Sequence, residues 1–262
     1  MDKEKPILVV GSIPFVMDYS EREIRRITRP ECIISFNDLD NKGDYYTYQL
    51  NIKPGLYDRI DFNDITDLTF DLILPSPIIN EPEKLTPEFK SDLNQMSQKE
   101  GWGFFLGDAN LAIRLTGKLP HIDLNGTDFT VDWRLRQLRE TEQPWKHINL
   151  NTLEMSESGD DYLTFYNTTS HEIYLPGDDL LAIPEDVIVL EIPNELKLDP
   201  VAVAIDYGLA ATDLLNEHPL PQSLAARISP ISASGLPEFV ANNMVRLDNS
   251  PNNEGRNPKI GR

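Results

Sequence analysis

Two pairs of arginines are the residues of this chain best suited to binding an anion. Arg22 with Arg25, and Arg136 with Arg139, are each spaced three positions apart. Guanidinium groups hold phosphate or carboxylate through paired N–H donors. Acidic residues stand close to each pair, for example Asp132 near the second. Because these neighbours can neutralise the arginines without an external ligand, a structural role is favoured and an anion site is the alternative.

An aromatic cluster is a second binding candidate. Trp102, Phe104 and Phe105 lie in a glycine-flanked segment. Three large apolar side chains so close together must be buried against something. We expect them to cover the junction between the two halves of the chain. The alternative is a patch that binds a partner.

The sequence predicts no catalytic, metal-binding or cofactor-binding residues. None of the four histidines has the close spacing to another His or Cys that is typical of a zinc site. The glycine-rich segment 101–110 lacks the Lys and Ser/Thr of a phosphate-binding loop, and no G-x-S-x-G motif occurs. These observations favour a protein that is not an enzyme.

The composition indicates which classes of binding partner and which cellular compartment are expected. The 262 residues include 43 acids and 24 bases, a formal net charge of -19, which repels nucleic acid and anionic lipid. Cys32 is the single cysteine, so no internal disulfide is possible. No apolar segment approaches the roughly 18 to 20 residues that span a bilayer. We expect a soluble cytoplasmic protein that binds another protein, without direct nucleic-acid or membrane binding.

The segment with the second arginine pair has a counterpart earlier in the chain. Residues 129–153 align without a gap to residues 15–39, 114 positions upstream, and 8 of the 25 paired residues are identical. Unrelated segments of this length share about one or two. We therefore predict an internal duplication, with repeats over 1–119 and 120–247 and a flexible tail over 248–262.

Three consecutive residues of the second repeat do not recur in the first. Trp145, Lys146 and His147 align with an acid, a cysteine and an isoleucine at positions 31–33. A function peculiar to the second repeat is therefore expected at these three positions. Shorter matches between the repeats follow in the same order, such as 111–115 with 224–228.

Strand and helix signals predict an α+β fold. Asn125-Gly126 lies between two alternating runs, which indicates a tight hairpin. Thr86 and Asp199 each precede a proline, a pattern typical of a capped helix start. Each repeat is expected to hold a mainly antiparallel or mixed sheet plus short helices. Further helices are expected over 108–117, from about Ala210, over 221–228 and over 236–247.

The span from Leu198 to Leu220 has the spacing of a helix-turn-helix. A recognition helix needs basic donors for phosphates and base edges, and this span contains no Lys or Arg. We predict an αα-hairpin that packs on a sheet instead.

The stretches "LPHIDLNGTDFTVDWRLRQLRETEQPW" and "IPEDVIVLEIPNELKLDPVAVA" resemble a group of uncharacterised proteins from gut-bacterial conjugative or integrated mobile elements. The resemblance covers nearly all of the second repeat and, more loosely, the first. It implies a cytoplasmic accessory protein, and it assigns no activity and no site residue.

Three functions from different classes remain open at this point. The leading hypothesis is a soluble, non-enzymatic accessory or interaction protein built from a tandem α+β repeat. The first alternative is an acidic decoy that mimics DNA toward a DNA-binding or restriction enzyme. The second is a hydrolase or transferase with a carboxylate site between the repeats.

Overall fold

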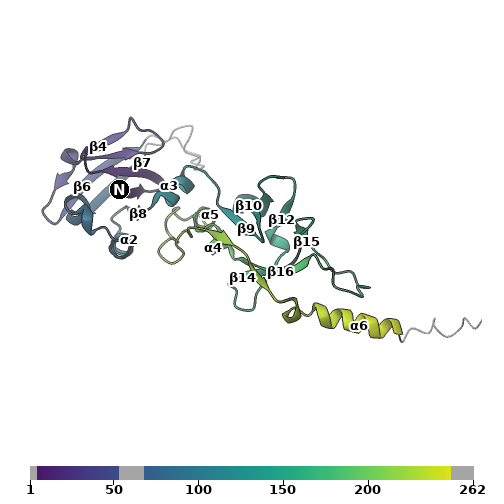
Figure 1. Cartoon of the computed structure of the whole chain (residues 1–262). Helices are drawn as coiled ribbons and strands as arrows, with labels where there is room; N and C mark the ends of the chain where they lie inside the picture. The colour runs from purple at the N-terminus through teal and green to yellow at the C-terminus, as the bar shows by residue number, and fades with distance from the viewer. Residues whose placement is uncertain (1–4, 53–67, 249–262) are drawn as a thin grey trace, which may run out of the picture. The chain divides into compact units, whose positions relative to one another are not determined.

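The computed structural model describes residues 5–52 and 68–248 of the chain. The fold is mixed α+β, as predicted (Figure 1). It divides into two compact units. Unit 1 contains Met1–Pro120 and Glu195–Gln222, and unit 2 contains His121–Asn194 and Ser223–Arg262. The chain therefore passes between the units three times. No helix in the described part is both long and apolar enough to cross a bilayer.

Unit 1 is built on an antiparallel five-stranded sheet in the order β4-β3-β2-β1-β8. A second, three-stranded antiparallel sheet has the order β5-β6-β7. The strands are β1 (Ile7–Val10), β2 (Ile13–Asp18), β3 (Glu23–Arg26), β4 (Ile33–Ser35), β5 (Asp40–Asn41), β6 (Tyr45–Ile52), β7 (Leu68–Pro75) and β8 (Phe105–Gly107).

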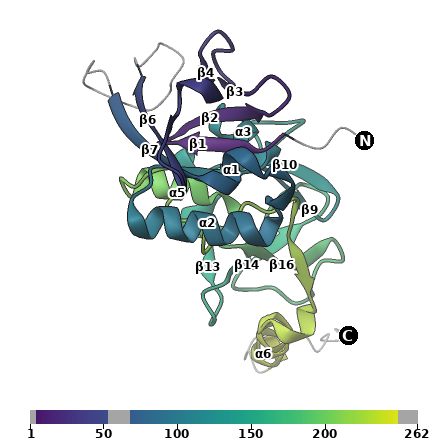
Figure 2. The same cartoon turned by 90° about the vertical axis from the view of Figure 1, so that its left-hand side faces the viewer.

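Side-chain caps set where the longer helices of unit 1 begin. Thr86 accepts a backbone N–H of α2 at 3.3 Å, and α2 ends at Gly101, whose φ of +68° is left-handed. Asp108 caps α3 and Asp199 caps α5 in the same way. These caps confirm the predicted helix starts. α2 packs against β8 (Figure 1), and Figure 2 shows α2 along its length. The helices are η1 (Phe36–Asp38), α1 (Ser76–Asn80), η2 (Pro82–Lys84), α2 (Pro87–Glu100), α3 (Ala109–Leu115), α4 (Glu195–Leu198) and α5 (Pro200–Asp206).

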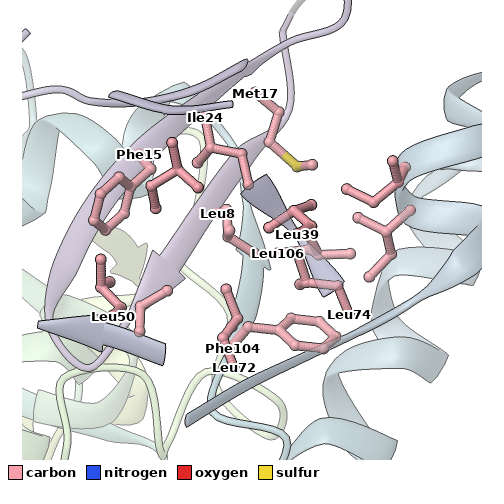
Figure 3. Close-up of a cluster of buried hydrophobic side chains, with 14 of the residues drawn as sticks. Leu8, Phe15, Met17, Ile24, Leu39, Leu50, Leu72, Leu74, Phe104 and Leu106 are labelled. Atoms are coloured by element: carbon pink, nitrogen blue, oxygen red, sulfur yellow. The ribbon is translucent and has the colours of Figure 1, made fainter. Parts of the chain in front are cut away.

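Both faces of β1 are buried, which accounts for its uninterrupted apolar run. Leu8 and Val10 point into the main core of unit 1, whose side chains come from both sheets and α2 (Figure 3). Ile7 and Val9 point to the opposite side and pack in a second cluster. The other buried members of that cluster are Leu111, Ala112, Val201, Ala211 and Leu215. Residues from Glu195–Gln222 therefore complete the core of unit 1.

The helix predicted from about Ala210 does not form, so the predicted αα-hairpin is wrong. Residues 211–217 make consecutive turns instead. The Asp213 side chain accepts the Ala210 N–H at 2.9 Å, and Gln98 of α2 donates to the Asp213 carbonyl at 3.1 Å. The Glu217 N–H donates to the Leu214 carbonyl, whereas in an α-helix it would donate to the Asp213 carbonyl, which here accepts from Gln98.

Unit 2 also contains two sheets. The first has the order β12-β11-β10-β9-β17, with β17 parallel to β9 and the other pairs antiparallel. The second has the order β13-β14-β16-β18, and β15 also pairs with β14. The elements are β9 (His121–Leu124), β10 (Thr127–Asp132), η3 (Trp133–Leu135), β11 (Gln137–Glu140), β12 (His147–Asn149), η4 (Leu150–Thr152), β13 (Glu154–Met155), β14 (Asp161–Asn167), β15 (Glu172–Ile173), β16 (Val187–Pro193), β17 (Leu224–Ala225), β18 (Arg227–Ser229), η5 (Ile231–Ala233) and α6 (Leu236–Asp248).

Local predictions in unit 2 have mixed outcomes. The hairpin is confirmed: Asn125 and Gly126 have φ of +54° and +87°, both positive as a type I′ turn requires. The helix over 236–247 is confirmed as α6. The helix over 221–228 is wrong, because Leu224 pairs with the open edge of β9. The tail predicted over 248–262 begins at the last residue of α6, and its other residues lie outside the described part.

The early elements of the two units recur at a fixed interval. β1 to β5 and η1 have the same first and last positions as β9 to β13 and η4 once 114 is added, as from Ile7 to His121. The left-handed residues Arg22 and Arg136, with φ of +55° and +56°, are also 114 apart. Later elements differ. Residues 111–115 belong to α3, whereas 224–228 include β17, so that sequence match is not a structural equivalence.

Candidate functional site

One arginine of each pair is neutralised within its own unit. Arg139 donates from Nη2 to Asp132 at 2.7 Å. Arg25 donates from Nε to Glu23 at 2.9 Å and from Nη1 to the carbonyl of Pro30 at 2.8 Å. These contacts are the ones that the structural interpretation predicts.

The other two arginines lie over aromatic rings. The Cζ atom of Arg136 is 3.7 Å from the Trp133 ring centroid, and that of Arg22 is 5.7 Å from the Phe36 ring centroid. Cation–π contacts of this kind hold the guanidinium against its own fold. The structure therefore gives each of the four arginines a partner inside its own unit.

The aromatic cluster belongs to the interior of unit 1. Trp102 and Phe104 stack with centroids 6.3 Å apart and join the main core, where Phe104 is buried. Phe105, next along β8, packs against the second cluster. Successive residues of a strand point to opposite faces, so β8 supplies side chains to both cores.

Trp145 and His147 lie on the surface of unit 2. They stand between β11 and the start of β12, and 73% of the Trp145 surface is exposed. His147 Nδ1 lies 3.2 Å from the Trp145 carbonyl oxygen. Neither residue lines the hollow that unit 2 presents elsewhere.

Unit 2 contains a hollow of about 580 Å³ on the outer face of its second sheet. The alternation of β14 creates this face: Tyr162 and Tyr166 point inward and are buried, whereas Leu163 and Phe165 point into the hollow. The remaining lining comes from β13, β16, the segment after β15, and the turn around η5. Its residues are Thr152, Glu154, Thr164, Ile173, Tyr174, Leu175, Pro176, Val189, Glu191, Ser229, Pro230, Ala233, Ser234 and Gly235.

Unit 1 has a smaller hollow at the same place in its strand pairing. It measures about 430 Å³ and lies on β5, β6 and β7. The cross-strand pair Gln49–Asp71 lines it, and the pair Phe165–Val189 lines the hollow of unit 2. Gln49 donates to Asp71 at 3.1 Å. The two hollows therefore share a position, and Gln49 and Asp71 of unit 1 stand where unit 2 has Phe165 and Val189.

No family model, curated protein or solved structure matches the chain. In the described part of the chain, no group of three or more His, Cys, Asp or Glu residues is arranged to hold a metal ion. The hollow of unit 2 combines apolar walls with a few polar groups, an arrangement typical of binding sites.

Glu191, which lines the hollow, belongs to a network of charged side chains. Glu191 accepts hydrogen bonds from Ser229 Oγ and from Arg227 Nε, the latter at 3.0 Å. Arg227 also donates from Nη2 to Asp161 at 2.6 Å. The Ser229 hydroxyl, and then Arg227, hold the pKa of Glu191 below its usual value. Glu191 is thus ionised at neutral pH and is already paired with Arg227.

A second polar cluster is buried on the inner side of β14. His171 Nδ1 lies 3.2 Å from Glu140 Oε2, and Glu140 is almost fully buried. His171 Nε2 is 3.5 Å from the Thr127 hydroxyl. Burial raises the pKa of Tyr166 nearby to about 12. This cluster joins the two sheets of unit 2 and is separated from the hollow by β14.

The hollow was missed by sequence reasoning, although a signal for it exists. The run 161–167 has apolar or aromatic residues at both odd and even positions, such as Leu163 and Phe165 as well as Tyr162 and Tyr166. A strand with one face in the core and the other in water should be polar on the second face. The surplus apolar residues therefore indicate a second buried or binding face.

Proposed function

We propose that this chain is a non-enzymatic protein-interaction module whose unit 2 hollow binds an apolar segment of a partner protein. The observation that carries the proposal is the exposed apolar surface there: Leu163 is 38% exposed and Leu175 is 82% exposed. Apolar side chains gathered in an open hollow are typical of interaction sites. A closed pocket for a small molecule would shield such residues from water.

An internal duplication is part of the same proposal. The shared interval of 114 positions in five strands supports it, as do the left-handed arginines Arg22 and Arg136. The hollow at matching strand pairs supports it further. In this view the first copy has Gln49 and Asp71 in its hollow, and the second copy, with Phe165 and Val189 there, became the binding unit of a cytoplasmic accessory protein.

An acidic decoy for a DNA-binding enzyme is the second candidate function. Residues 147–194 contain no Lys or Arg, which favours a locally negative surface. The paired carboxylates weaken this candidate, because Asp161 and Glu191 are already neutralised by Arg227. The proposed carboxylate enzyme has less support, since Glu191 is held ionised and no histidine lines the hollow.

Selection from a random peptide library tests the interaction function. The full chain is immobilised, and bound peptides are compared with those bound by a Phe165→Gln variant, which places the Gln49 chemistry of unit 1 in the hollow of unit 2. We expect enriched peptides that carry apolar residues and bind only the parent chain. Peptides that bind both chains equally, or no enrichment, would contradict the proposal.

A further inference from the structure

The chain that builds the unit 2 hollow is strongly acidic. Residues 147–194 carry ten carboxylates and no Lys or Arg: Glu154, Glu157, Asp160, Asp161, Glu172, Asp178, Asp179, Glu185, Asp186 and Glu191. Glu154 and Glu191 line the hollow itself, and Glu154 is exposed. The nearest basic side chain in the network is Arg227, which is shared between two carboxylates. The rim of the hollow therefore keeps an excess of negative charge.

This charge selects among possible occupants. An acidic segment would be repelled, and an apolar neutral segment would gain nothing from the rim. A segment with Lys or Arg beside its apolar residues would gain attraction at close range and a faster encounter. Charge complementarity of this kind contributes to specificity as well as to affinity.

The spacing of the apolar side chains defines the shape of the occupant. Leu163 and Phe165 are two residues apart on β14, which places them about 7 Å apart on one face. An extended peptide presents every second side chain with the same repeat. Leu175 and Val189 widen this apolar floor.

Building on the proposed interaction function, we propose that the hollow of unit 2 binds an extended basic segment of a partner protein. Its central residues are apolar at alternate positions and rest on Leu163 and Phe165. Lys or Arg residues beside them reach Glu154 and Glu191, which lie on the strands either side of Leu163. The partner is therefore a protein with an exposed basic-apolar stretch.

Fluorescence anisotropy with the full chain and labelled nine-residue peptides tests this proposal. Each peptide has Leu, Phe and Leu at alternate central positions, and its two terminal residues at either end are Lys, Gln or Glu. We expect the Lys-flanked peptide to bind at least about ten-fold more tightly than the Glu-flanked one. Raising the salt concentration from about 50 to 500 mM should remove most of that difference.

Charge-reversal variants test whether the preference for Lys-flanked peptides comes from Glu154. Glu154→Lys should weaken the Lys-flanked peptide by about three-fold or more and strengthen the Glu-flanked peptide. Glu83→Lys makes the same change in charge on unit 1 and should leave both affinities unchanged. Equal effects of the two variants would overturn the proposal, because the attraction would then come from net charge alone.

Two further variants separate this proposal from the proposed function. Phe165→Gln and Leu175→Ser should each remove binding, and Leu175 is so exposed that its replacement leaves the fold intact. If Gln-flanked and Lys-flanked peptides bind equally and both variants abolish binding, the hollow binds apolar segments and the basic preference is wrong. If binding is absent, or unaffected by both variants, the interaction function itself is contradicted.

Discussion

Arg114 holds Asp199 with hydrogen bonds to both carboxylate oxygens. Nε donates at 3.0 and 3.1 Å, and Nη2 donates at 2.8 Å. The Asp199 side chain is fully buried and also caps α5. Arg114 lies in the last turn of α3, so this pair fastens Glu195–Gln222 to the rest of unit 1.

Removing the arginine should destabilise unit 1 strongly. Arg114→Met leaves the Asp199 carboxylate buried without its cation, and we expect a loss of about 3–5 kcal/mol in the free energy of unfolding. Urea titration followed by circular dichroism measures it. The double variant with Asp199→Asn keeps a capping oxygen without the charge and should recover part of the loss. A loss below about 1 kcal/mol in the single variant would mean that the pair is not an anchor.

Truncation of Leu215 should loosen unit 1 and spare unit 2. Leu215 is buried in the cluster that covers the outer face of β1. Leu215→Ala should cost about 2–5 kcal/mol, seen as faster amide hydrogen exchange in β1 and β2 than in β14 and β16. Leu209→Ala removes a residue that is 43% exposed on the same segment and serves as the control. Equal loss of protection in both units would count against the division into units.

Replacement of Tyr166 by Phe should not destabilise unit 2. The Tyr166 hydroxyl is buried without a hydrogen-bond partner among the described residues; Thr127 is near enough to lower its pKa but does not meet hydrogen-bond geometry. Removing this group should raise the free energy of unfolding by up to about 1 kcal/mol. A clear loss of stability would mean that the hydroxyl has a partner.

The same substitution should change the alkaline limit of stability. Burial raises the pKa of Tyr166 from 10.0 to about 12. As the pH rises, Tyr166 therefore ionises in the unfolded chain before it ionises in the folded chain. The stability of the folded state is unaffected by this below pH 10 and falls as the pH rises toward 12. Tyr166→Phe lacks this loss, and its advantage over the parent chain should grow across that window. Thermal melts at pH 9, 10 and 11 measure it.

Lowering the pH should reduce the stability of unit 2, because Glu191 becomes protonated. Hydrogen bonds from Ser229 and Arg227 hold the pKa of Glu191 below its usual value. Ionised Glu191 therefore adds to the free energy of unfolding at any pH above its pKa in the unfolded chain. This contribution is lost as the pH falls through the lower pKa that Glu191 has in the folded chain. Glu191→Gln should be less stable than the parent at pH 7, and the two curves should converge in acid. Glu172→Gln, a change at an exposed carboxylate, is the control and should follow the parent curve.

Local chemistry was predictable where a few neighbouring residues decide the structure. Thr86 and Asp199 cap their helices, and Asn125-Gly126 makes its turn, because short-range bonds and allowed φ angles determine these features. The segment 211–217 was not predictable. Its turns depend on Gln98, which is distant in sequence and reaches it only in the folded unit.

In the candidate site, too, features set by neighbouring residues were predictable and features set by distant residues were not. The partners of Arg25 and Arg139 were predictable because the acids are close in sequence. The hollow was not, because Leu163, Val189 and Ala233 meet only when β14, β16 and η5 are assembled. Strand pairing over such separations is specified by the whole sheet and leaves only a weak local pattern.

The position of Glu195–Gln222 also sets an order for biosynthesis. Ile7 and Val9 leave the ribosome early, yet Val201, Ala211 and Leu215, which cover them, are translated roughly 200 residues later. At roughly 5–20 residues per second, that interval lasts about 10 to 40 s. During that interval the apolar side of β1 that holds Ile7 and Val9 lacks these covering residues and is exposed to water. We expect the nascent chain to bind general chaperones until residues 195–222 have been synthesised. A chain that ends before these residues should fail to fold unit 1 as well as unit 2.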